Sequence, residues 1–356
     1  MYMGLNLNFN EKSIRDYYWH SCLLKRDNYI LKFNGTTNSD FVSLKSTKYF
    51  LRETQQKGQC GPIDNRIIFN DTRIARGVST STDITDNRRC SIQALSNGAF
   101  AMSGHCQDFF DNGSMIEFNV PISNTNGDPN PSSTNDQYPM NLSSMNCRDV
   151  GREDFCIFGV SPNANTGLLP AIAQDDFLRV TELAPNLGSQ ITIRGYGTDD
   201  GSNNRVLQTH TGPNEGRDGD QITYKTDTTN GNSGSPILRA GNLQYSYGIH
   251  NNGGCNTDGT GANRGLSYNN SNLSDALNSF YSQDFIHADL ISNSAIEDGS
   301  IFRPYNTIEE VNQRAGELNS STTDAVLVRG TYNEDGEIIL NNSMLMHAPV
   351  GDVLIK

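Results

Sequence analysis

Short apolar runs alternate with clusters of Gly, Asn, Asp and Pro through residues 60–281, and this spacing is typical of an all-β barrel or sandwich. The clearest hairpin covers residues 90–106, where Asn97 and Gly98 supply two turn positions that tolerate positive φ. Residues 272–281 (NLSDALNSFY) then have the spacing of one short amphipathic helix. The pattern predicts an all-β domain that ends in a helix.

The two ends of the chain follow other patterns. Residues 1–59 are mixed and polar without a clear period, and we interpret them as an N-terminal extension or propeptide. Residues 60–282 form the predicted main domain, and residues 283–356 form a smaller β-rich C-terminal appendage.

The appendage mixes one helix signal with strand signals. Residues 307–319 (TIEEVNQRAGELN) favour a helix, in which Thr307 and Glu310 match a capping box. Residues 325–328 and 337–340 are predicted as short strands. The segment is small for an independent hydrophobic core.

Composition and charge narrow the classes of partner. The chain has 356 residues, of which 27 are basic and 40 acidic, so its net charge is −13. Binding to phosphates needs clustered Lys and Arg, so we expect neither nucleic acid nor an anionic membrane as the main partner. No segment reaches the ~18 apolar residues of a transmembrane helix. The first twenty residues also lack the basic and apolar regions of a signal peptide.

Seven cysteines indicate the compartment. None of them forms a C-x-x-C pair, which excludes a zinc-ribbon or thioredoxin-like site, and we expect neither a metal nor a cofactor. Their spacing in an acidic, Asn-rich chain favours an oxidising compartment and some disulfides, with at least one thiol left unpaired. Cys156 lies in an apolar run, where an inert buried thiol is at least equally expected. The seven are Cys22, Cys60, Cys90, Cys106, Cys147, Cys156 and Cys255.

Three short stretches carry candidate chemistry together. AMSGHC contains His105, EDFCI contains Asp154, and GNSGSP contains Ser233. A serine hydroxyl needs an imidazole to take its proton, and a buried carboxylate to hold that imidazole in the right tautomer. Glycines around the serine allow a sharp turn, so that successive N–H groups can point at one oxyanion.

These stretches, in this order, resemble the chymotrypsin-fold serine proteases, and they look most similar to the bacterial glutamyl endopeptidase branch. The stretch CGPIDNR at residues 60–66 is similar to the start of such catalytic domains. The resemblance covers about residues 60–281. It implies a double six-stranded β-barrel with a short C-terminal helix, and a disulfide between Cys90 and Cys106 behind the histidine.

The same resemblance implies a role for each residue. His105 would be the general base, Asp154 would orient it, and Ser233 would be the nucleophile. The N–H groups of Gly231 and Ser233 would form the oxyanion hole. The implied protein is a secreted, monomeric serine endopeptidase that acts on protein or peptide substrates.

Substrate preference has two open interpretations. His250, in GIHNNGG, lies where glutamyl endopeptidases place a pocket histidine, and Thr228 matches a hydroxyl that they also use, which favours cleavage after Glu or Asp. Asp227 lies six residues before Ser233, where an acid in trypsin-type enzymes holds Arg or Lys. From another class, the chain could be a catalytically inactive homologue that serves in binding or adhesion.

Activation departs from the trypsin pattern. Arg66-Ile67 resembles a trypsin-type processing site, but Asn232 stands where trypsin-type enzymes pair an Asp with the new amino terminus. Because Asn232 has no charge, we expect a different arrangement, in which removal of residues 1 to about 66 leaves Ile67 or a neighbour first.

The appendage resembles the opening coil of parallel β-helix proteins. Residues 302–305 (FRPY), 330–334 (GTYNE) and 348–351 (APVG) carry this resemblance. Such solenoids need several stacked repeats, and the appendage has room for one or two. A cap, a secretion or attachment module, and a remnant all stay open as its role.

Overall fold

The computed structural model describes residues 58–80, 88–319, 323–334 and 339–356. Nearly all of the predicted N-terminal extension, including Cys22, lies outside these residues. In the part that is described, most of the regular structure is β, as the spacing of the apolar runs predicts.

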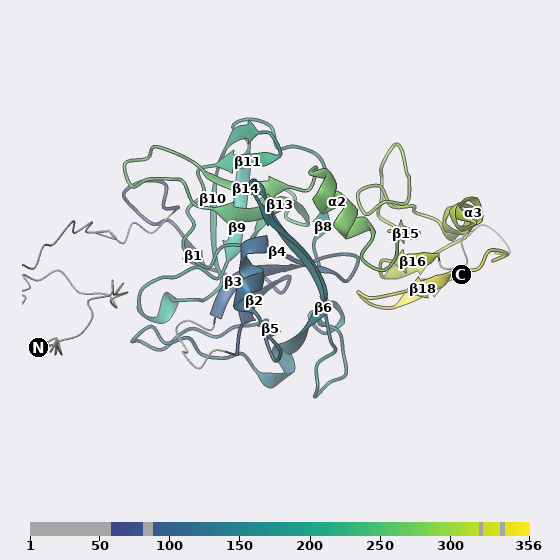
Figure 1. Cartoon of the computed structure of the whole chain (residues 1–356), viewed down its shortest axis with the longest axis horizontal. Helices are drawn as coiled ribbons and strands as arrows, with labels where there is room; N and C mark the ends of the chain where they lie inside the picture. Colours follow the sequence, from purple (N-terminus) through teal and green to yellow (C-terminus); the bar gives the residue numbers. More distant parts are fainter. Residues whose placement is uncertain (1–57, 81–87, 320–322, 335–338) are drawn as a thin grey trace, which may run out of the picture. The chain divides into compact units, whose positions relative to one another are not determined.

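Six antiparallel strands close a first barrel, shown in blue and dark teal in Figure 1. In order around the barrel they are β2 (Ile74–Val78), β3 (Arg88–Ala94), β4 (Phe100–Met102), β7 (Glu153–Val160), β6 (Gln137–Val150) and β5 (Met115–Glu117). Buried aromatic and aliphatic side chains fill its interior, among them Ile92, Phe118 and Tyr138. Two 3₁₀ helices, η1 (Gly104–Phe109) and η2 (Thr134–Asp136), lie in its connections.

A second ring of six antiparallel strands closes because β9 pairs with both β10 and β12. In order they are β9 (Gln190–Gly195), β10 (Gln208–Asp218), β11 (Gln221–Tyr224), β14 (Asn263–Ser267), β13 (Tyr245–Asn252) and β12 (Pro236–Arg239). Outside this ring, β1 (Ile67–Ile68) pairs with β10, and β8 (Arg179–Val180) pairs in parallel with β13. The connections contain α1 (Pro170–Ala173) and η3 (Gly201–Asn203).

One apolar cluster joins the two barrels, beside the separate cores inside each of them. Ala101 and Phe155 of the first barrel pack in the same buried cluster as Ile249 and Leu266 of the second, together with Leu273 of α2 (Ser271–Asn278). The short helix predicted after the barrels is therefore present, and the double six-stranded β-barrel of the chymotrypsin type is confirmed.

The turn of the first predicted hairpin is only partly as expected. Its strands are β3 and β4, and Gly98 has the positive φ of 79° that the prediction requires. Asn97 does not, because the Gly98 N–H donates to Leu95 O at 2.9 Å and Leu95 N–H donates to Ala99 O at 2.9 Å. This longer loop, with glycine in the left-handed position, needs positive φ at one residue only.

The C-terminal segment pairs its strands in parallel, as a β-coil does. Strand β15 (Phe285–Ala288) pairs with β16 (Asp324–Leu327), which pairs with β18 (Leu345–His347), and β17 (Gly330–Tyr332) pairs with β19 (Val353–Ile355). Strands β15, β16 and β18 appear in yellow-green to yellow in Figure 1.

The predicted C-terminal helix is confirmed as α3 (Ile308–Leu318), and Thr307 Oγ1 accepts the N–H of Glu310 at its start. The strand predicted over residues 337–340 is wrong at Ile339 and Leu340, which are exposed and not paired in a sheet, while 337 and 338 lie outside the described residues.

This C-terminal segment also shares buried contacts with the barrels. Asp289 accepts two hydrogen bonds from the Arg179 guanidinium, at 2.6 and 3.1 Å, and both side chains are largely buried. Ile301 belongs to the apolar cluster that joins the two barrels, and Val328 packs with Phe177. The segment therefore contributes to the same folded unit as the barrels.

Three disulfides cross-link the described residues. Cys90–Cys106, the pairing that the family resemblance implies, is present. Cys60–Cys255 and Cys147–Cys156 are the other two, so the interpretation of Cys156 as an inert free thiol is wrong. Within the described part of the chain, no helix is long and apolar enough to cross a membrane.

Candidate functional site

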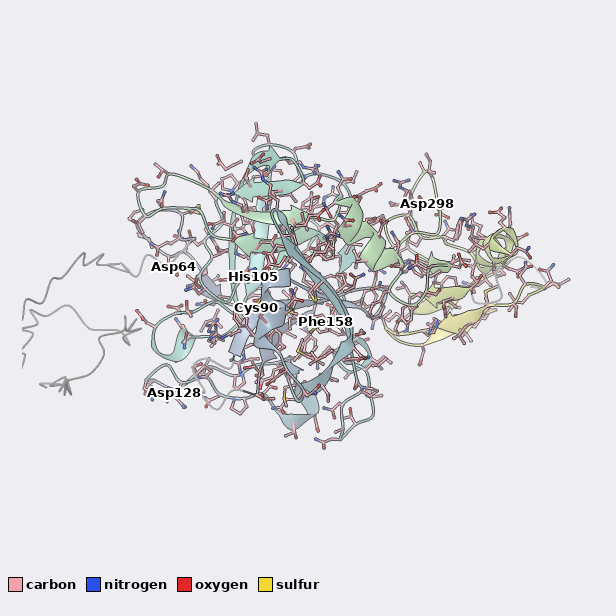
Figure 2. The ribbon with its side chains drawn as sticks, in the orientation of Figure 1. Asp64, Cys90, His105, Asp128, Phe158 and Asp298 are labelled. Atoms are coloured by element: carbon pink, nitrogen blue, oxygen red, sulfur yellow. A yellow bond between two sulfur atoms is a disulfide. The ribbon has the colours of Figure 1, made fainter. Side chains whose placement is uncertain are left out.

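His105 and Asp154 form a hydrogen-bonded pair in the first barrel. His105 is the second residue of η1, which the Cys90–Cys106 disulfide fastens to β3 (Figure 2). Gly104 allows β6 to approach closely, because a Cβ there would lie 1.9 Å from Arg148 O. Asp154, in β7, accepts the His105 N–H at 2.9 Å through Oδ1 and contacts His105 Nδ1 at 2.8 Å through Oδ2.

The electrostatics of this pair favour a defined tautomer. An ionised Asp154 can only accept, so Nδ1 of His105 carries the proton and Nε2 is left as a base. Burial lowers the pKa of His105, but the hydrogen bond and charge of Asp154, with the charge of Asp149, outweigh it, and the net pKa is raised above 6.5.

Ser233 lies in a tight turn that leads into β12. Gly231 and Gly234 flank it with φ of 100° and 92°, which only glycine adopts without strain. A Cβ at Gly234 would lie 2.0 Å from Ser91 O. The turn is fixed from two sides, since Ser91 N–H donates to Ser233 O at 2.8 Å and Gly234 N–H donates to His250 O at 2.7 Å.

The three side chains face one cavity of about 430 Å³, which His105, Asp154 and Ser233 all line. The Ser233 hydroxyl donates to Asn251 O over a long 3.5 Å and makes no hydrogen bond to His105. Catalytic hydrogen bonds are often long in ligand-free structures and shorten when substrate binds. The structure therefore brings the hydroxyl and the imidazole to one cavity, and proton transfer between them stays a prediction.

The backbone N–H groups of Gly231 and Ser233 have no acceptor among the described residues. The turn that carries them is held by Asn232, whose Oδ1 accepts the Thr229 N–H at 2.9 Å. Ser91 Oγ donates to Gly231 O at 2.9 Å, which holds the peptide between Gly231 and Asn232. Ser233 lines the candidate cavity and Gly231 is not among its lining residues, so two N–H donors that converge on one oxyanion stay a prediction.

Arg66 is a residue of this region that sequence reasoning assigned only to processing. Its guanidinium is buried and donates to Thr229 Oγ1 at 2.8 Å and to Thr198 O at 3.0 Å, and it pairs with Asp64 at 2.6 Å. Ile67 instead lies in β1 and is 64% exposed. Arg66, and not Ile67, thus supports the turn that contains Asn232 in the intact chain; the predicted processing near residue 66 stays a prediction.

His250 lines the same cavity from β13 and is almost fully buried. Burial lowers its pKa to about 3, with a further contribution from the charge of His105, so the ring is neutral at physiological pH. A neutral imidazole can still donate one hydrogen bond to a carboxylate.

Asp227 does not line this cavity. Its carboxylate is buried and accepts Cys60 N–H at 2.6 Å, Asn65 N–H at 2.8 Å and Asn65 Nδ2 at 2.9 Å. Thr228 is buried as well, and its hydroxyl, close to Gly58, has no partner among the described residues. Of the three residues predicted to set specificity, the structure brings His250 alone to the cavity with Ser233.

Asn251 is a structural support that the sequence did not reveal. Its Nδ2 donates to Asp154 O at 2.6 Å and to Ser103 Oγ at 3.0 Å, while its Oδ1 accepts the Leu266 N–H at 2.7 Å. An Asn beside a pocket histidine carries no motif that marks this role.

Among the described residues, the potential metal ligands at this site do not converge in a usable form. Cys90, Cys106 and His105 have ligand atoms within 4.8 Å of one another, but the two sulfurs are joined in a disulfide and cannot act as thiolates.

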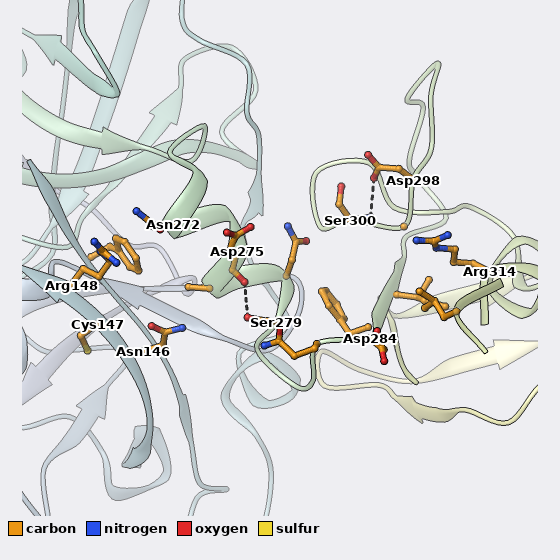
Figure 3. Close-up of a pocket in the computed structure, with 18 residues that line it drawn as sticks. Asn146, Cys147, Arg148, Asn272, Asp275, Ser279, Asp284, Asp298, Ser300 and Arg314 are labelled. Atoms are coloured by element: carbon orange, nitrogen blue, oxygen red, sulfur yellow. Dashed lines mark hydrogen bonds between the residues drawn. The ribbon is translucent and has the colours of Figure 1, made fainter. Parts of the chain in front are cut away.

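A larger cavity of about 880 Å³ lies elsewhere (Figure 3). Arg148, Asp275, Asp284, Asp298 and Arg314 are among its lining residues, and neither His105 nor Ser233 lines it. Its charged groups have mixed sign and include no paired nucleophile and base, so the smaller cavity is the candidate active site.

No protein-family model matches the chain, and no curated protein matches it in sequence. Several solved structures are similar to part of it. A Glu endopeptidase in complex with MPD is 19% identical, with a TM-score of 0.41 over 62% of this chain and 97% of that one. The VesB protease of Vibrio cholerae is 14% identical, with a TM-score of 0.41 over 58% of this chain and 65% of that one. Human heparin binding protein is 12% identical, with a TM-score of 0.42 over 59% of this chain and 92% of that one. At these identities and TM-scores the likeness assigns no function and no functional residue to this chain.

Proposed function

We propose that the chain is a serine endopeptidase that cleaves peptide bonds after Glu, or Asp, through an acyl-enzyme. One observation carries the proposal: the hydrogen-bonded pair of His105 and Asp154 faces Ser233 across a single cavity. A hydroxyl, a base with a free Nε2 and a buried carboxylate are together the requirements of nucleophilic acyl transfer.

In the proposed mechanism, Ser233 Oγ attacks the carbonyl carbon of the scissile bond while His105 Nε2 takes its proton. The oxyanion of the tetrahedral intermediate receives hydrogen bonds from the N–H groups of Gly231 and Ser233, each worth about 3–4 kcal/mol of barrier. His105 then gives the proton to the leaving amine as the C–N bond breaks. Water repeats the sequence on the acyl-enzyme, and the carboxylic acid and free Ser233 are released.

The proposed preference for an acidic residue on the acyl side of the cleaved bond rests on the side chains that line the cavity. His250 can donate a hydrogen bond to a carboxylate, and its burial beside Ser233 supports recognition of an acidic side chain. Asp227, the basis of the trypsin-like alternative, has its carboxylate occupied by Cys60 and Asn65. This occupation counts against cleavage after Arg or Lys.

The three disulfides support action in an oxidising environment outside the cytoplasm. The removal of a propeptide, the activation of a zymogen and the monomeric state of the chain stay predictions.

A fluorophosphonate probe tests the nucleophile. We expect covalent labelling of Ser233 that is abolished in Ser233→Ala and retained in Ser143→Ala, which alters an exposed serine. A chain that does not label would favour the inactive binding homologue.

Peptide-library profiling tests the preference separately. If His250→Ala still cleaved after Glu with the selectivity of the wild type, His250 would be excluded as the recognition residue. Cleavage after Arg or Lys would favour the trypsin-like alternative.

A further inference from the structure

The backbone around His250 is fixed before any substrate binds. His250 N–H donates to Ser235 O at 2.8 Å, and His250 O accepts both the Gly234 N–H at 2.7 Å and the Ser103 hydroxyl at 2.8 Å. The ring therefore enters the cavity from a rigid strand. What the ring offers a substrate depends on which of its nitrogens carries the proton.

A tyrosine contacts the inner nitrogen of this ring. Tyr224, at the end of β11, places its hydroxyl 2.6 Å from His250 Nδ1. The tyrosine is fully buried among Ile222, Ile237 and Tyr247, and its hydroxyl has no other hydrogen bond among the described residues. Burial raises the pKa of Tyr224 well above 10.0, so the hydroxyl keeps its proton.

Two tautomers of a neutral His250 can be compared. If Nδ1 carried the proton, it would donate to the tyrosine oxygen, and the Tyr224 proton would be buried without an acceptor, which costs about 1–3 kcal/mol. If Nε2 carries the proton, Nδ1 accepts from the hydroxyl and both buried groups are satisfied. The second tautomer is therefore preferred.

The outer nitrogen is then the group that meets the substrate. Nε2 of His250 has no protein partner among the described residues, and His250 lines the cavity with Ser233. With a proton on Nε2 it donates to a carboxylate; without one it would present a lone pair and repel it.

We propose that Tyr224 is a positioning residue for substrate selection: it fixes His250 as an Nε2–H donor, and thereby makes the pocket select a carboxylate on the acyl side of the cleaved bond. The proposal rests on the proposed preference for Glu. It assigns recognition to a neutral donor held in one tautomer, and it gives a role to a buried residue that never touches substrate.

The first test is spectroscopic and needs no mutation. In the ¹⁵N-labelled full-length chain, which has only six histidines, long-range ¹H–¹⁵N correlation distinguishes the two neutral tautomers. We expect His250 to be protonated at Nε2 in the wild type and to show a mixture of tautomers in Tyr224→Phe. A wild-type His250 protonated at Nδ1 would overturn the proposal even if the variant failed to fold.

The second test is kinetic. Matched peptides with Glu or Gln before the cleaved bond give a ratio of kcat/KM values. We expect Tyr224→Phe to lower the Glu:Gln ratio about tenfold, mainly through KM, as the loss of one defined hydrogen bond to a charged group predicts. The rate of fluorophosphonate labelling of Ser233 should stay within about twofold of wild type, because the nucleophile is untouched.

Tyr268→Phe is the matched control. Its hydroxyl is equally buried and donates to Gln93 Oε1 at 3.0 Å, and it makes no hydrogen bond to His250. We expect this control to leave the Glu:Gln ratio unchanged. A wild-type preference for Glu that Tyr224→Phe retains in full would overturn the role of the tyrosine alone, whereas a wild type without that preference would overturn the proposed specificity and this inference together.

Discussion

The substitution Asp227→Asn distinguishes two possible functions of this buried carboxylate, which are substrate recognition and structural support. In a trypsin-like enzyme this residue would hold the substrate's Arg or Lys. Here Asp227 instead accepts three hydrogen bonds from Cys60 and Asn65, and so connects the segment before the first barrel to the wall of the second. The substitution keeps the shape of the side chain and removes its charge.

The size of the effect follows from these contacts. Oδ1 accepts one backbone N–H and Oδ2 accepts another, so the NH₂ group of an asparagine must face a donor in either orientation. One partly buried donor then loses its partner, which costs about 1–3 kcal/mol, and the remaining bonds lose their charge assistance, which costs roughly another 1–2 kcal/mol. We expect the free energy of unfolding to fall by about 2–5 kcal/mol. For a domain of this size the melting temperature should fall by roughly 5–15 °C.

The assay combines melting with specificity. Thermal unfolding by circular dichroism is measured in a Ser233→Ala background, which prevents autolysis, and peptide-library profiling is done with Ser233 intact. Asp200→Asn is the control, because Asp200 is exposed and its side chain makes no hydrogen bond within the described residues.

We expect Asp227→Asn to melt earlier with an unchanged order of preferred residues. An unchanged melting temperature together with selective loss of cleavage after Arg or Lys would refute this reasoning and restore the trypsin-like interpretation.

Two further predictions concern the pH profile and the C-terminal segment. Because Asp154 raises the pKa of His105 above 6.5, and the imidazole must be neutral to accept a proton, the acid limb of kcat/KM should have its midpoint above pH 6.5. The pKa of His250 near 3 keeps that ring out of this limb, so a midpoint at or below pH 6.5 would contradict the assignment. Asp289→Ala leaves the buried Arg179 guanidinium unpaired and should lower the free energy of unfolding by about 3–5 kcal/mol, measured by denaturant unfolding. Ser233 labelling at low temperature should be unchanged, and equal stability of variant and wild type would show that the pair contributes nothing.

The features that could be predicted from the sequence are those set by neighbouring residues or by a short motif. The fold class followed from short apolar runs between turn residues, and the Cys90–Cys106 bridge followed from a family resemblance. The helix α3 and its cap at Thr307 followed from a four-residue pattern. Each of these depends on neighbours in the chain or on a short motif, so sequence alone could carry it.

The features that were missed depend on strand register and on distant pairing. Cys147 and Cys156 lie directly opposite each other in β6 and β7, and that register follows from how the intervening hairpin folds. Asp227 turns toward Cys60, which is 167 residues away, and no local pattern indicates that direction. Tyr224 likewise meets His250 only because β11 and β13 both pair with β14.

The candidate site is held together across the seam of the two barrels. The Ser103 hydroxyl of the first barrel donates to His250 O, 147 residues along the chain, and Asn251 of the second donates to Asp154 O, 97 residues back. Each of these bonds ends on a residue of the proposed catalytic or recognition machinery or on its immediate neighbour. A shift between the barrels would therefore move the base relative to Ser233, and a misplacement of about 1 Å can cost roughly a hundredfold in rate. The rigidity of the seam is for this reason a requirement of the proposed chemistry, and the buried side chains of Ser103 and Asn251 contribute to it through these bonds.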